Sequence, residues 1–202
     1  MKTCYVIGAG ECSELKIDKK PEDVVIAADG GLKHLENNGI KPDIIIGDFD
    51  SLDYLPGGEN VIRLKPEKDV TDMYAAVEEG LKLGCDSVRL FGATGGRFDH
   101  TLANIQLIAS LAEKGVSALI NDGGCVIMAL HNGTLKFDSS KKGYISVFSH
   151  SDESKGIYIK GLKYPLENAT LTNSFSLGVS NEFLGIESEI TVEKGTLIII
   201  CS

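Results

Sequence analysis

Two aspartates that follow an apolar run are the first residues whose spacing could do chemistry. Ile44–Ile46 leads directly into Asp48 and Asp50. Residues i and i+2 of an extended chain point to the same side, so the two carboxylates should lie together. Carboxylates about 4 Å apart repel by ~4 kcal/mol at an effective dielectric of 20, and a proton or cation must relieve that repulsion. All-oxygen ligands favour Mg²⁺. The pair predicts a magnesium site, and the alternative is a solvated acidic turn.

A second acidic segment contains Lys68, Asp69 and Asp72 and opens a helical pattern. Asp69 followed by Asp72 is typical of a helix N-cap with an acidic third residue, and this role alone would account for both. Asp72 near Lys68 also fits a site that holds a metal and a phosphate. The sequence leaves both interpretations open.

A glycine-rich segment, Gly92–His100, lies between an apolar run and a long helical pattern. Glycines let backbone N–H groups approach an anion, and a helix N-terminus adds partial positive charge. Arg97 supplies a fork of donors for phosphate oxygens. The segment predicts a phosphate site different from a P-loop, because GxxxxGK[ST] does not occur in the chain. A flexible loop ahead of a capped helix is the alternative.

The segment Gly8-Ala9-Gly10 imitates part of a dinucleotide fingerprint. Asp29 follows at about the expected distance, but Ser13 stands where the third glycine would be. Three interpretations remain: an NAD or FAD site, a tight turn of the fold, or a different nucleotide-facing role that includes Asp29-Gly30-Gly31.

The elements that must position these residues alternate in the first 120 residues. Continuous apolar runs predict strands covered on both faces, at 4–7, 24–28, 44–46, 61–64, 88–91 and 118–120. Helical periodicity predicts helices over 71–83 and 100–114, each followed by glycine. This alternation predicts an α/β domain with a mainly parallel, helix-covered sheet. Because the carboxyl ends of parallel strands share one edge, the acidic and glycine-rich segments should meet there.

The helical period disappears from about residue 134. Short strand-like runs at 144–148, 156–159, 169–172 and 197–201 predict a small all-β domain, an antiparallel sandwich or barrel. His131–Gly133 is predicted as the turn between the two parts. We expect an α/β domain at 1–128 and an all-β domain at 129–202.

Composition narrows the classes of function. The 202 residues carry 20 Lys and Arg against 29 Asp and Glu, a formal net charge of −9. Such a surface disfavours nucleic acid as a partner. The five cysteines show no disulfide or metal-ligand spacing. No run approaches the ~20 apolar residues of a membrane helix, so we expect no membrane association and a cytoplasmic location.

Four segments, taken in order, resemble the thiamine pyrophosphokinase family: Ala28–Gly31, Gly47–Ser51, Lys68–Asp72 and Gly95–His100. A fifth, Gly178–Phe183, resembles the thiamine-contacting strand of that family's β domain. The resemblance covers nearly the whole chain. It implies that the α/β domain at 1–128 is catalytic and binds ATP and magnesium, and that the all-β domain at 129–202 binds thiamine. It also implies a homodimer with active sites between subunits and a Mg²⁺-dependent transfer of pyrophosphate from ATP to the hydroxyl of thiamine, which leaves AMP.

The resemblance also implies the site residues. Asp48, Asp50 and Asp72 match the magnesium ligands, and Asp99 matches an active-site acid that joins them and Arg97 in the catalytic set. Ser180 and Asn181 match thiamine contacts, with Phe183 as an aromatic wall for the cationic vitamin. The residues expected to bind ATP are Asp29, Gly30, Lys68, Asp69, Thr94, Gly95, Gly96, Arg97 and His100. Lys68 stands where some relatives have glutamine, so its role rests on charge.

Two other classes of function remain open at this point. One is a non-catalytic nucleotide or vitamin sensor that kept the fold, which would bind ligand and release no AMP. The other is a Rossmann oxidoreductase built on Gly8 and Gly10, which would bind NADH and be indifferent to loss of Asp48.

Overall fold

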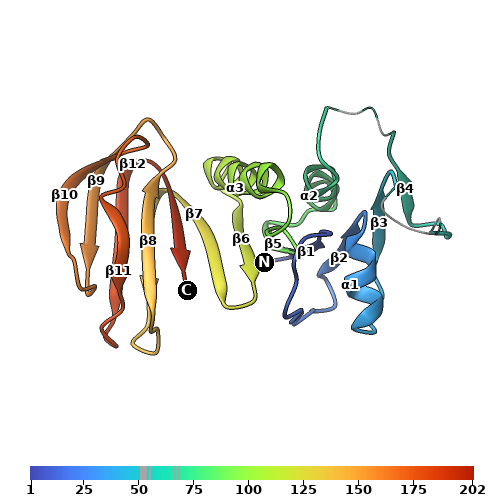
Figure 1. Cartoon of the computed structure of the whole chain (residues 1–202), viewed down its shortest axis with the longest axis horizontal. Helices are drawn as coiled ribbons and strands as arrows, with labels where there is room; N and C mark the ends of the chain where they lie inside the picture. Colours follow the sequence, from blue (N-terminus) through green and yellow to red (C-terminus); the bar gives the residue numbers. More distant parts are fainter. Residues whose placement is uncertain (51–53, 55, 66, 68) are drawn as a thin grey trace. The chain divides into compact units, whose positions relative to one another are not determined.

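The computed structural model describes residues 1–50, 54, 56–65, 67 and 69–202 (Figure 1). They form two compact units. Unit 1 comprises Met1–Leu107 and Val116–Gly123, and unit 2 comprises Ile108–Gly115 and Gly124–Ser202. The predicted boundary at 128/129 stays a prediction. None of the helices in the described part of the chain has the length and apolar character to cross a membrane.

Unit 1 is built on a parallel sheet. Its strands are β1 (Thr3–Ile7), β2 (Val24–Ala28), β3 (Ile44–Gly47), β4 (Val61–Arg63), β5 (Ser87–Phe91) and β6 (Ser117–Asp122). They lie in the order β6-β5-β1-β2-β3-β4, and every neighbouring pair is parallel. All six strands predicted for this part of the chain are present. Their buried apolar residues form the middle layer of the unit.

Two helices cover opposite faces of this sheet, because side chains alternate along each strand. Tyr5 and Ile7 pack with Leu32 and Leu35 of α1 (Gly31–Asn37). On the other face, Cys4 contacts Gly80 of α2 (Asp72–Lys82). A third helix is α3 (Phe98–Glu113). The sequence predicted α2 and α3 but not the short α1.

The start of α2 differs from its prediction. The hydroxyl of Thr71 is the N-cap and accepts a hydrogen bond from the main-chain N–H of Tyr74 at 3.1 Å. Asp69 is exposed and lies outside the helix. The predicted Asp69–Asp72 capping pair is therefore wrong. Threonine caps a helix as aspartate does, so the two candidates could not be separated by residue type.

Unit 2 contains antiparallel strands: β7 (Cys125–Phe137), β8 (Tyr144–Ser149), β9 (Glu153–Lys160), β10 (Leu166–Thr172), β11 (Gly178–Glu182) and β12 (Ser188–Cys201). The long β12 pairs with β7 along most of its length, with β9 through its first half and with β8 through its second half. Buried side chains of β7, β8, β9, β10 and β12 form the core of unit 2, and they include Ile145, Ile159 and Ile190.

The predicted turn at His131–Gly133 is wrong, because these residues lie inside β7. Asn132 has φ 42°, and the register between β7 and β12 shifts between Val192 and Thr196. The side-chain oxygen of Asn132 accepts from the N–H of Gly195 at 2.9 Å, which holds the irregularity together. Asn and Gly favour a positive φ in a bulge as well as in a turn, so the dipeptide alone did not distinguish them.

Candidate active site

A pocket lies in unit 1 at the carboxyl ends of the strands, at the point where the strand order reverses. Strand β1 has β2 on one side and β5 on the other, so the loops after these strands diverge at this point. Ligands of open α/β sheets bind at such a switch point. The pocket has a volume of about 120 Å³. The residues that line it are Gly8, Ala9, Gly10, Ala28, Asp29, Thr71, Asp72, Met73, Gly92, Ala93, Thr94, Gly95, His100 and Asn104.

An acidic group lies at the neighbouring strand ends. Asp29, Asp48 and Asp50 each offer a carboxylate oxygen, and these atoms lie within 4.8 Å of one another. Asp29 follows β2, and the other two follow β3. The sequence predicted that Asp48 and Asp50 meet, but it assigned Asp29 to ATP and not to this group. The approach of Asp29 follows from pairing, because β2 and β3 are neighbours in the sheet.

The third predicted ligand, Asp72, is the first residue of α2 and lines the pocket together with Asp29. Its Oδ1 atom is buried. A carboxylate in the first turn of a helix is stabilised by the helix dipole. Asp72 therefore brings a fourth carboxylate to the strand edge, on the pocket side of the acidic group.

The segment Gly8–Gly10 forms a structural turn. The N–H groups of Gly8 and Gly10 donate to the carbonyl oxygens of Phe91 and Gly92 at 2.8 and 2.9 Å. A Cβ on either glycine would lie 2.7 Å from the Gly92 oxygen. The glycines let two main chains approach, and their N–H groups are occupied. This geometry argues against the dinucleotide-fingerprint interpretation.

Arg97 and Asp99 bind each other at the start of α3. Nε and Nη2 of Arg97 donate to the two carboxylate oxygens of Asp99, at 3.1 and 2.6 Å. The hydrogen bond from Arg97 holds the pKa of Asp99 below its usual range. Both side chains are exposed, and Phe98 between them is 90% exposed. The sequence predicted separate roles for these two residues and did not predict that they pair.

Of the other residues of unit 1 that the sequence predicted to bind ATP, some line the pocket and some do not. Gly95 and His100 line the pocket, and Gly95 and Gly96 have positive φ of 77° and 59°. Gly30 is buried as the N-cap of α1, and its carbonyl accepts from the N–H of Lys33. Asp69 is exposed outside the pocket lining. Lys68 lies outside the described residues.

Three polar contacts around the pocket were missed by sequence reasoning. The hydroxyl of Thr94 donates to Asp122 at the end of β6. Nε2 of His34 lies 2.8 Å from the carbonyl oxygen of Gly10. The amide of Asn104, on α3, donates to the carbonyl oxygen of Ala93 at 2.7 Å. These contacts join residues 11 to 28 positions apart in the sequence, beyond the range of a local pattern.

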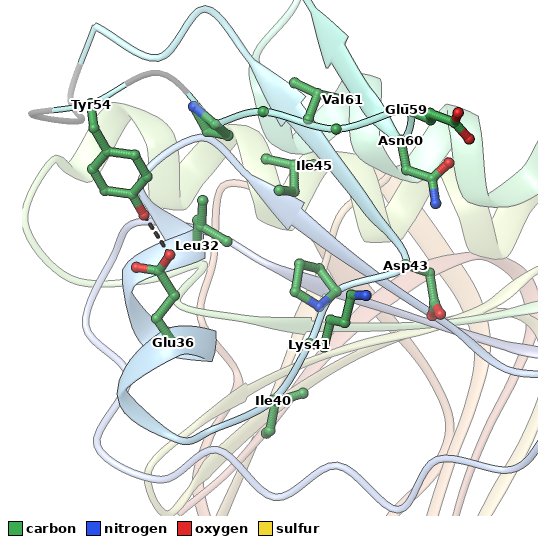
Figure 2. A pocket seen from close by; sticks show the side chains of 14 residues that line it. Leu32, Glu36, Ile40, Lys41, Asp43, Ile45, Tyr54, Glu59, Asn60 and Val61 are labelled. Atoms are coloured by element: carbon green, nitrogen blue, oxygen red, sulfur yellow. Dashed lines mark hydrogen bonds between the residues drawn. The ribbon is translucent and has the colours of Figure 1, made fainter.

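A larger pocket in unit 1, about 600 Å³, lies at the opposite end of β3 and β4 (Figure 2). Asp43 and Asn60, which immediately precede these strands, line it, with Leu32 and Ile45 on its apolar side. Figure 2 shows Tyr54 donating to Glu36, a bond of 2.6 Å that raises the pKa of Tyr54 to about 12. This pocket contains none of the predicted site residues, so the smaller one is the candidate active site.

The predicted thiamine residues lie at the end of β11 in unit 2. Ser180 is exposed with φ 59°, and its N–H donates to the hydroxyl of Ser146. Asn181 is 3% exposed, accepts from the N–H of Tyr164 at 2.9 Å and donates to the carbonyl of Tyr164 at 2.7 Å. Phe183 packs edge-on against Phe137, with ring centroids 5.3 Å apart. Two of the three side chains therefore have structural contacts.

Comparison with known proteins identifies the family. The family model for the thiamin pyrophosphokinase catalytic domain matches residues 18–120, and the model for the vitamin B1 binding domain of the same family matches residues 132–197. The thiamine pyrophosphokinase of Bacillus subtilis is 32% identical over 185 residues, which cover 88% of this chain and 86% of that protein.

Solved structures agree with this result. The crystal structure of thiamine pyrophosphokinase from Bacillus subtilis matches with a TM-score of 0.85 and 28% identity, covering 99% of this chain and 98% of that one. The structure from Geobacillus thermodenitrificans matches with a TM-score of 0.81 and 29% identity, covering 100% and 97%. On the two family models and these relatives, the chain belongs to the thiamine pyrophosphokinase family.

Proposed function

We propose that this chain transfers the β,γ-pyrophosphate of ATP to the hydroxyl of thiamine, in a Mg²⁺-dependent reaction that yields thiamine diphosphate and AMP. The observation that carries the proposal is the acidic group Asp29, Asp48 and Asp50, beside a pocket at the switch point of the sheet. Enzymes of this kind work mainly by positioning and charge neutralisation.

The donor set fits magnesium. Three carboxylates with oxygens within 4.8 Å of one another repel, and a divalent cation with oxygen ligands relieves that repulsion. We assign Asp48, Asp50 and Asp72 to the metal, with Asp29 as a further ligand. When bound, Mg²⁺ would neutralise the charge on the phosphate oxygens of ATP.

The start of α3 is the proposed phosphate contact. Gly95 and Gly96 adopt the left-handed conformation that turns main-chain N–H groups outward to an anion. The exposed guanidinium of Arg97 is held by Asp99 and would reach the transferring group or the departing AMP. Lys68, Thr94 and His100 complete the proposed ATP contacts. The thiamine hydroxyl attacks the β-phosphorus and gives up its proton, for which Asp72, Asp99 and the phosphate oxygens are the candidate acceptors. The bond from that phosphorus to the α-phosphate oxygen breaks, and AMP leaves with that oxygen.

Unit 2 is the proposed thiamine-binding part, with Ser180, Asn181 and Phe183 as its candidate residues. We assign the catalytic domain to 1–128 and the vitamin domain to 129–202, in line with the ranges of the two family models. The location proposed for this activity is the cytoplasm.

A second copy of the chain is the proposed partner, with active sites between subunits. Large apolar side chains are exposed on either side of β11: Phe175 is 69% exposed, Leu184 is 54% exposed and Ile186 is 53% exposed. Exposed apolar side chains gathered in one stretch are typical of an interaction surface.

Product analysis tests the proposed function. The chain is incubated with thiamine, ATP and Mg²⁺, and AMP, ADP and thiamine diphosphate are quantified. AMP and thiamine diphosphate in equal amounts support the proposal. ADP in place of AMP would indicate a kinase that transfers a single phosphoryl group. Ligand binding without AMP at any Mg²⁺ concentration would indicate a sensor.

A further inference from the structure

Asn104 is a buried polar residue that lines the candidate active site. The residue lies on α3, is 5% exposed and lines the pocket. Its Nδ2 donates to the carbonyl oxygen of Ala93 at 2.7 Å. This bond fixes the orientation of the amide, because the opposite orientation would set two acceptors against each other. In the part of the chain that the structure describes, no group donates to Oδ1 of Asn104.

The polar lining of the pocket is rich in acceptors. The carboxylates of Asp29 and Asp72 line it together with the Asn104 amide. A bare phosphate at this position would meet like charge, whereas a hydroxyl or amino group would find acceptors. The volume of about 120 Å³ equals roughly four water molecules at ~30 Å³ each. A sugar ring or its hydroxyls fit that volume, and a whole nucleoside does not.

The place of Asn104 in the fold separates it from Asp48 and Asp50. Its partner Ala93 follows β5, whereas Asp48 and Asp50 follow β3. These strands are three spacings apart in the order β5-β1-β2-β3, or roughly 14 Å at about 4.8 Å per strand. Asp29, which follows β2 between them, belongs to the acidic group and also lines the pocket, so the pocket leads from the acidic group to Asn104. The sugar of a nucleotide whose terminal phosphates lie at the acidic group can span this gap.

We infer that Asn104 is a further substrate-binding residue, whose amide oxygen accepts a hydrogen bond from a ribose hydroxyl of ATP. The inference rests on the proposed function, because it places the phosphates of ATP at the acidic group. His100 lies one helical turn earlier on the same face of α3 and also lines the pocket. The two residues form one side of the proposed ribose site.

The test compares ATP with 2′-deoxy-ATP and 3′-deoxy-ATP as substrates. We expect wild-type kcat/KM to fall about 5- to 50-fold for the analogue that lacks the bound hydroxyl, since the amide oxygen of Asn104 then loses its hydrogen-bond donor. In Asn104→Ala this preference should fall to within about twofold of unity. Each preference is a ratio within one variant, so it is insensitive to the folded fraction. Gln106→Ala, an exposed change on the same helix, should keep the wild-type ratio.

Two results would overturn the inference: a wild-type enzyme that does not distinguish ATP from either analogue, or an Asn104→Ala enzyme that keeps the full preference. If Asn104→Ala does not fold, Asn104→Leu retains most of the side-chain volume and takes its place. If the wild type forms no AMP, the proposed function fails, and the same ratios are measured as binding constants for ATP and its analogues by calorimetry.

Discussion

The main-chain N–H of Phe49 donates a hydrogen bond to Oδ1 of Asp29 at 3.1 Å. Both residues have positive φ, 65° and 48°, a conformation that is unfavourable for non-glycine residues. The bond joins the loops after β3 and β2, and Phe49 is 4% exposed. Asp48 and Asp50 flank Phe49, so the strained loop is held where both carboxylates approach Asp29.

Loss of one carboxylate from this group should abolish most turnover. We expect Asp48→Asn or Asp50→Asn to lower kcat by about 100-fold or more while the far-UV circular dichroism spectrum stays unchanged, because a proposed metal ligand is lost. AMP release is measured against Mg²⁺ concentration. Asp18→Asn, an exposed change outside the group, is the control. Unchanged turnover with a normal Mg²⁺ response would exclude both residues from the metal site.

Gly10 should be required for folding and not for binding a dinucleotide. In Gly10→Ala the new Cβ would overlap the carbonyl oxygens of Gly92 and Thr94. We expect a loss of about 1–3 kcal/mol in the free energy of unfolding, measured with urea. Gly57→Ala places its Cβ in open space and should be close to neutral. The prediction is wrong if the two variants are equally stable, or if NADH binds the wild type saturably.

Asp23 should make stability depend on pH. Burial raises the pKa of this carboxyl, but hydrogen bonds from the N–H groups of Thr3 and Lys20 lower it more, and the net shift is downward. A depressed folded-state pKa gives stability that is present above the unfolded-state pKa and is lost as pH falls through the folded-state value. Asp23→Asn should therefore cost about 1–3 kcal/mol at pH 7.

That cost should shrink as the pH falls below the unfolded-state pKa of an aspartate, about 3.9, because the unfolded wild-type chain then takes up the proton before the folded one. Urea unfolding of the wild type and Asp23→Asn at several pH values measures it. Glu22→Gln, an exposed neighbouring change, gives the background pH dependence. A difference that is constant from pH 7 to pH 3 would show that the charge of Asp23 does not contribute.

Asn181 should have two separable effects. Asn181→Ala removes the partners of the Tyr164 N–H and carbonyl groups and of the Glu182 N–H. We expect a lower melting temperature together with a higher KM for thiamine. Asn173→Ala, which removes an exposed bond to Asp152, should change neither strongly. A rise in the KM for ATP alone would contradict the assignment of the vitamin pocket to unit 2.

The proposed dimer should depend on the exposed apolar residues near β11. Phe175→Asp and Leu184→Asp should each shift the molar mass measured by light scattering from that of two chains toward that of one, because burial of a charge disfavours the interface. Leu83→Asp, at an exposed apolar position of unit 1, is the control. A wild type that is monomeric at all concentrations would refute the proposed dimer.

The strands of unit 1 were predictable because strands of a parallel sheet are buried on both faces and read as continuous apolar runs. Helix α1 was not, since its seven residues start at Gly31 and are too short to show a period. His131–Gly133 was misassigned because Asn at positive φ serves a bulge and a turn alike. Asp48 and Asp50 could be predicted as a pair of metal ligands because they lie only two residues apart in the sequence.

Residue types and local spacing by themselves determined the parallel sheet, the aspartates at its carboxyl edge and, through the ordered motifs, the resemblance to a family. Only the tertiary structure brought Asp29 to Asp48, paired Arg97 with Asp99, occupied the N–H groups of Gly8 and Gly10 and turned Asn104 into the pocket. The reason is physical. Strand pairing and helix docking bring together residues distant in the chain, and a local pattern carries no information about which distant group will become its partner.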